Sequence, residues 1–167
     1  GKHESFHHEP LRRIIDVSLD IFGAVYVNIP NDMYNALALF MILYSKSTLI
    51  VPFDGSATDL SSRMKVIELI KKAQRLPLKN LKYLAFEYHP GASLDESDIR
   101  QLTDGMYIGK VTYELSRIKA RNDFKSGYAS VMTKKNEEEY SKILNKFGFD
   151  TKTKLTDRVK NLFERRK

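Results

Sequence analysis

The sequence predicts an α/β fold in which a parallel sheet lies between two layers of helices, a three-layer αβα sandwich. Along its 167 residues, short β-branched apolar segments alternate with amphipathic segments at helical spacing, a pattern that favours right-handed crossovers between parallel strands. The strand segments are apolar on both faces, as strands covered by helices on both sides are. The length suits one domain, which we expect over residues 1–150, followed by a basic segment over residues 151–167.

Four segments predict strands because each is short, rich in β-branched or aromatic residues, and bounded by turn-forming residues. In chain order they cover residues 24–29, 47–52, 81–88 and 106–113. Pro30 breaks the first, Pro52 ends the second, and the turn His89-Pro90-Gly91 ends the third. Since parallel sheets place their ligand sites at the carboxyl ends of strands, we expect a site where these segments end.

Helices are expected between and after these strands, where apolar residues recur at helical spacing. They cover about residues 10–23, 33–44, 58–75, 94–102, 135–147 and 155–166. Pro10 suits the first turn of the first helix. Thr58 or Asp59 can cap the third, and Ser93 with Glu96 forms a capping box for the fourth.

The composition excludes several classes of function. The chain has no cysteine, so disulfides, thiolate catalysis and cysteine-held zinc or iron–sulfur sites are excluded, and a cytoplasmic location is expected. No apolar run approaches the roughly 20 residues of a membrane-spanning helix, so we expect a soluble protein with no membrane partner. Three histidines near the amino terminus, His3, His7 and His8, are expected to bind metal only adventitiously, and no metal site is predicted.

Positive charge is concentrated in the last 17 residues. Residues 151–167 contain seven basic and two acidic residues, and therefore hold five of the seven net positive charges of the chain. Lys and Arg on one helix face would contact nucleic-acid phosphates without reading sequence, whereas the alternative is an ordinary solvated face of a docked helix. The expected DNA-binding residues are Lys152, Lys154, Arg158, Lys160, Arg165, Arg166 and Lys167.

The order of four segments resembles the ParA/MinD family of deviant P-loop ATPases, which partition plasmids and chromosomes. Residues 25–31 are similar to the family's Walker B strand, and residues 35–52 to its helix with an Asn-Ala-Leu element and the following strand. Residues 85–90 are similar to the strand that ends near the adenine, and residues 111–127 to the segment that wraps the base. Asn28 stands where the family has the Walker B aspartate, and His89 where it has an acidic residue.

The resemblance implies a partial or degenerate P-loop NTPase-like fold with nucleotide-binding residues at Asn28, His89, Glu114 and Ser116. No Gly-x-x-x-x-Gly-Lys-Ser/Thr occurs in the 167 residues, and neutral Asn28 does not replace a carboxylate that organises Mg²⁺. We therefore expect no catalytic residue and no ATP hydrolysis by this chain alone. ATP with Mg²⁺ would bind only with a phosphate-binding loop supplied elsewhere.

The resemblance implies a function in DNA partition, with nonspecific DNA binding and self-association. The expected partners are DNA, a ParB-like or other protein, and a second copy of the chain, for which the apolar helix at residues 33–44 offers a face. Two alternatives remain open within the family. The chain is either a degenerate, non-catalytic protein-interaction module or a fragment of an active ParA-type ATPase. A third alternative is an unrelated doubly wound binding domain.

Overall fold

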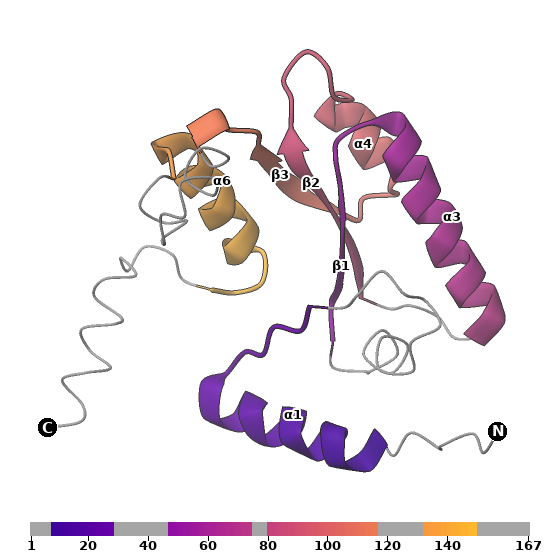
Figure 1. Cartoon of the computed structure of the whole chain (residues 1–167), viewed down its shortest axis with the longest axis vertical. Coiled ribbons are helices and arrows are strands. Elements are labelled where there is room, and N and C mark those ends of the chain that lie inside the picture. The colour runs from indigo at the N-terminus through magenta and orange to yellow at the C-terminus, as the bar shows by residue number, and fades with distance from the viewer. Residues whose placement is uncertain (1–7, 29–46, 75–79, 117–131, 150–167) are drawn as a thin grey trace, which may run out of the picture. The chain divides into compact units, whose positions relative to one another are not determined.

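The computed structural model describes residues 8–28, 47–74, 80–116 and 132–149 (Figure 1). Over these residues the chain is an α/β protein with a three-stranded parallel sheet and four helices. The chain divides into two compact units, residues 1–49 with 75–80, and residues 50–74 with 81–167. The predicted helices at residues 33–44 and 155–166 lie outside the described part of the chain.

The first unit contains helix α1, His8–Phe22, as the sequence predicts. Gly23 ends it with a positive φ of 72°, and its N–H donates to the carbonyl of Leu19 at 2.8 Å, a glycine C-cap. The predicted strand at residues 24–29 is wrong over residues 24–28, which form no strand. A β-branched run forms a strand only where a neighbouring strand supplies hydrogen bonds and a packing surface, and none in the described sheet pairs with this run.

The second unit carries the sheet, and the other three predicted strands are confirmed. They are β1 (Leu49–Phe53), β2 (Leu81–Tyr88) and β3 (Tyr107–Thr112), in the order β1-β2-β3. Strands β2 and β3 run parallel, with Tyr83 opposite Tyr107 and Phe86 opposite Val111. Helix α3 (Ala57–Gln74) connects β1 to β2, and α4 (Glu96–Leu102) connects β2 to β3.

Helices lie on both sides of this sheet. Figure 1 shows α6 (Lys134–Asn145) on one side, and α3 and α4 on the other. Ile143 of α6 packs against Ile108 and Val111 of β3. The opposite face of β2 presents Tyr83, which is buried near Glu68 of α3.

An irregularity near the end of β2 changes which face its last residue occupies. The register with β3 shifts between Phe86 and Tyr88, and Glu87 adopts a positive φ of 60°. Because Glu87 is an extra residue in the pleat, Tyr88 is buried rather than exposed. Its ring lies 4.4 Å from the ammonium of Lys110, and its hydroxyl donates to the carbonyl of Leu94 at 3.0 Å.

The predicted capping box at Ser93 and Glu96 is wrong. The N-cap of α4 is Asp95, and its side chain makes no capping hydrogen bond. The Ser93 hydroxyl oxygen instead accepts the backbone N–H of His89 at 3.0 Å, which closes the turn after β2. Ser93 is four residues after His89, so its hydroxyl can accept a hydrogen bond from the turn instead of capping the helix.

Among residues 8–28, 47–74, 80–116 and 132–149, no helix is both long and apolar enough to cross a membrane.

Candidate functional site

The carboxyl ends of β2 and β3 stay side by side beyond the sheet. The N–H of Tyr113 donates to the carbonyl of Tyr88 at 2.9 Å. The rings of His89 and Tyr113 are stacked, with centroids 4.3 Å apart and planes 28° from parallel. The structure therefore brings the predicted residue His89 next to the segment that carries Glu114.

The turn after β1 is joined to the turn after β2. The N–H of Leu94 donates to the carbonyl of Gly55 at 2.9 Å. Gly55 has a φ of 86°, and a Cβ built there would lie 2.5 Å from the Ser93 hydroxyl oxygen and 2.9 Å from its Cβ. Only glycine fits this left-handed position in contact with a second loop. All three strand ends thus belong to one connected edge.

Acidic side chains at the end of β1 are occupied by the entry to α3. Asp54 accepts the N–H of Ser56 at 2.8 Å, and Asp59 accepts the N–H of Asp54 at 3.1 Å and the Nε–H of Arg63 at 3.1 Å. Hydrogen bonds from the Ser56 side chain and then its backbone hold the pKa of Asp54 below the ordinary value. These carboxylates therefore shape the loop rather than form an acid–base pair.

Glu114 belongs to a polar cluster between the end of β3 and α6. It accepts a hydrogen bond from the hydroxyl of Thr133, which caps α6 by accepting the N–H of Asn136. Asn136 is fully buried, and its amide donates to the carbonyl of Thr112 and to Glu139, both at 3.1 Å.

Glu139 is the centre of this cluster. It accepts the backbone N–H of Thr112 at 2.7 Å and its hydroxyl at 2.6 Å, in addition to the amide of Asn136. Sequence reasoning missed Glu139 and Asn136, since their partners are 24 and 27 residues away. Thr133 directly before a helix carries a recognisable N-cap signal.

The other predicted site residues belong to the first unit, follow β3 in the chain or fall outside the described residues. Asn28 is exposed and belongs to the first unit. Ser116 is exposed and lies four residues beyond the end of β3. The basic segment 151–167 falls outside the described part of the chain. Within the described part, no group of three or more His, Cys, Asp or Glu side chains is placed to hold a metal ion.

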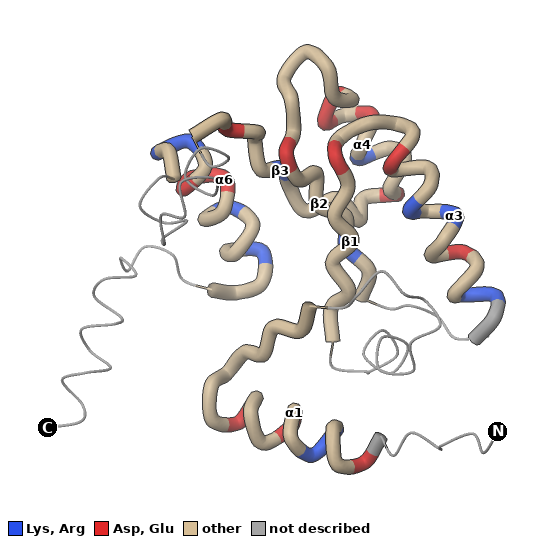
Figure 2. The backbone as a smooth tube through the Cα atoms, in the orientation of Figure 1, with Lys and Arg blue, Asp and Glu red and all other residues tan. Residues whose placement is uncertain are grey.

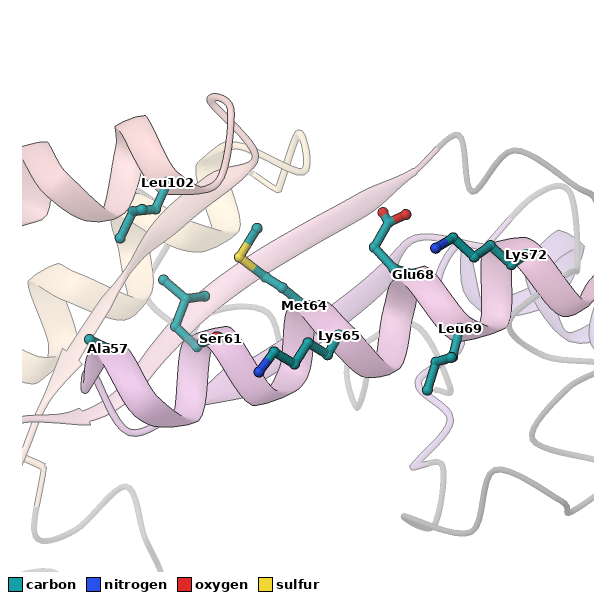
Figure 3. Close-up of a pocket in the computed structure, with 9 residues that line it drawn as sticks. Ala57, Ser61, Met64, Lys65, Glu68, Leu69, Lys72 and Leu102 are labelled. Atoms are coloured by element: carbon teal, nitrogen blue, oxygen red, sulfur yellow. The ribbon is translucent and has the colours of Figure 1, made fainter.

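A groove along α3, closed at one end by α4, was not predicted from the sequence (Figure 3). Its volume is about 700 Å³, and Leu60 and Met64 line it. Leu69 and Leu102 also line it, although 60 % and 50 % of their surfaces are exposed. The charged side chains along it are Lys65, Glu68 and Lys72. Figure 2 shows that acidic and basic residues both occur along this helix, and the charged residues that line the groove are of both signs.

No known protein family, curated protein or solved structure matches this chain.

Proposed function

We propose that this chain is a ParA/MinD-like domain that acts in DNA partition. It binds DNA nonspecifically through residues 151–167, associates with further copies, and does not hydrolyse ATP by itself. The proposal includes the three-layer, P-loop NTPase-like form of the fold. Residues 24–28 form no strand, so the resemblance of residues 25–31 to the family's Walker B strand does not support the proposal.

The observation that carries the proposal is the parallel order β1-β2-β3, with α3 and α4 as the connections. Three of the segments that resemble the family contain these strands or the turns that follow them. The stacked pair His89 and Tyr113 is the surface on which a nucleotide base would lie if one binds, with Glu114 and Ser116 following in the chain.

DNA binding is tested by titrating a labelled nonspecific duplex with the full chain between about 50 and 200 mM salt. A protein that neutralises several phosphates loses about three orders of magnitude in affinity over this range. Replacing Lys152, Lys154, Arg158 and Lys160 with glutamine should lower the slope of log affinity against log salt by about three to four units. Repeating the titration with ATP and Mg²⁺ reports whether a nucleotide contributes.

The matched control removes four charges elsewhere on the chain. Lys65, Lys72, Lys134 and Lys135 are exposed, and their replacement with glutamine should leave the slope within about one unit. An equal loss in both variants would show that net charge alone attracts the DNA. No binding at 50 mM salt would refute the DNA-binding proposal.

The groove along α3 favours a second candidate, the non-catalytic protein-interaction module. Exposed Leu69 and Leu102 beside Lys65 and Lys72 suit an amphipathic helix with acidic residues at its margin. An acidic amphipathic helical peptide should bind the chain, and Leu69→Asp should weaken it at least tenfold. Unchanged affinity in Leu69→Asp would exclude this groove as the binding surface.

A further inference from the structure

Helix α1 leaves large apolar side chains exposed. On this helix of 15 residues Ile14 is 63 %, Val17 50 % and Ile21 66 % exposed. An exposed contiguous apolar patch marks an interaction site more often than an isolated apolar side chain does. Ile15 is buried, and it points about 100° away from Ile14 around the helix. The stripe Ile14, Val17 and Ile21 therefore lies on a different face of α1 from buried Ile15.

The spacing of the stripe matches the seam of a coiled coil. Ile14, Val17 and Ile21 are separated by three and then four residues, the spacing of the a and d positions of a heptad. Such a seam packs against a helix that carries the same pattern. A second α1 provides that pattern.

Charges beside the stripe select the direction of the pairing. Arg13 and Asp20 are seven residues apart, so they flank the same edge of the stripe. Both are exposed, and neither forms an ion pair with another described residue. Arg12 and Asp16 lie on the opposite face, where they pair with each other at 3.9 Å. Figure 2 shows an acidic residue in the first turn of α1, basic residues after it and acidic residues in its second half.

When two identical helices pack antiparallel about a two-fold axis, the same edge of each faces the other. Arg13 then lies opposite Asp20 of the second copy, and the contact occurs twice because the interface is isologous. In a parallel pair, the edge of the stripe that carries Arg13 and Asp20 would face the opposite edge of the partner's stripe. Arg13 would then have no opposite charge at the seam. The charge pattern fits only the antiparallel arrangement.

We propose that α1 forms an antiparallel homodimer with α1 of a second copy of this chain, through the stripe Ile14, Val17 and Ile21. This pairing does not depend on DNA binding by residues 151–167. A helix of 15 residues is about 22 Å long, which is short for a stable interface. We therefore expect a weak dimer, with a dissociation constant on the order of 100 µM.

The test uses charge reversal and sedimentation equilibrium of the full chain between about 10 µM and 1 mM. Arg13→Glu places Glu opposite Asp20, and Asp20→Arg places Arg opposite Arg13, so each variant alone should dimerise at least tenfold more weakly. In a one-to-one mixture of the two variants, every facing pair is again oppositely charged. The mixture should therefore recover the dissociation constant of the unchanged chain within about threefold.

The matched control is Arg12→Glu, which makes the same charge change on the opposite face of α1 and should leave the dissociation constant unchanged. Circular dichroism checks that each variant keeps its helix content. A chain that stays monomeric at 1 mM would overturn the proposal and leave a lipid surface or another part of the chain as the occupant of the stripe. Failure of the mixture to recover dimerisation would also overturn it.

Discussion

Replacing Gly55 with alanine should destabilise the protein more than the same change at Gly91, because only Gly55 lies against a second loop. Both glycines have a positive φ, 86° and 82°. A Cβ at Gly91 meets no atom within 4 Å, whereas one at Gly55 lies 2.5 Å from the Ser93 hydroxyl oxygen and 3.3 Å from the Tyr88 ring. The pair therefore separates backbone strain from steric overlap.

The left-handed backbone costs an alanine about 1 kcal/mol at either position. Alanine also restricts the unfolded chain equally in both variants, so this effect cancels in the comparison. Overpacking adds about 1–3 kcal/mol at Gly55 alone. We expect a loss of about 1 kcal/mol for Gly91→Ala and about 3 kcal/mol for Gly55→Ala.

Urea denaturation of the full chain measures both losses as shifts in midpoint at constant slope. Adding Ser93→Gly to Gly55→Ala removes both close contacts to residue 93 and should recover about half of the added loss, once the effect of Ser93→Gly alone is subtracted. If Gly55→Ala costs no more than Gly91→Ala, the two loops are not in contact and the connected edge described above does not exist.

Two further predictions concern carboxylates. The pKa of Asp54 lies below its unfolded value of 3.8, because the Ser56 side chain and backbone donate to it, so its stabilising contribution is present above about pH 4 and is lost as pH falls further. Asp54→Asn should flatten the acid limb of stability measured from pH 7 to pH 2.5, and an unchanged limb would contradict this. Glu139→Ala removes the acceptor that the buried Thr112 N–H uses and one of the two acceptors of the Asn136 amide, and should cost about 3 kcal/mol in urea denaturation, against less than about 0.5 kcal/mol for exposed Glu138→Ala. Equal losses in these two variants would show that the cluster is not formed.

The elements predicted best from the sequence are those whose two ends are marked by local turn residues. Strand β2 has its predicted bounds, 81–88, since aromatic and leucine residues fill most of an eight-residue run between clear turn residues. The run at residues 24–28 has equally high β propensity, yet it forms no strand. Propensity describes a fit to a sheet, and the sequence does not say whether a neighbouring strand is present.

The candidate site was predictable in position but not in its contacts. That the strand ends meet follows from a parallel sheet, which the alternation of segments predicts. The Ser93 hydroxyl had two possible partners, and the turn was closer than the helix. The hydrogen bonds of Glu139 and the groove below Leu102 depend on how a helix packs against elements that are distant in sequence, and no local pattern encodes that packing.

The extra residue at Glu87 is the one place where β2 tolerates a change of length. The register pairs Phe86 with Val111 and Tyr88 with Thr112, so a chain without Glu87 would regain a regular pleat and leave Tyr88 opposite Thr112. A deletion between Tyr83 and Phe86 would instead turn part of the strand to the opposite face, because the pleat alternates with a period of two. Homologous chains are therefore expected to keep the number of residues between Tyr83 and Phe86 and to differ in length, if anywhere in this strand, at the position of Glu87.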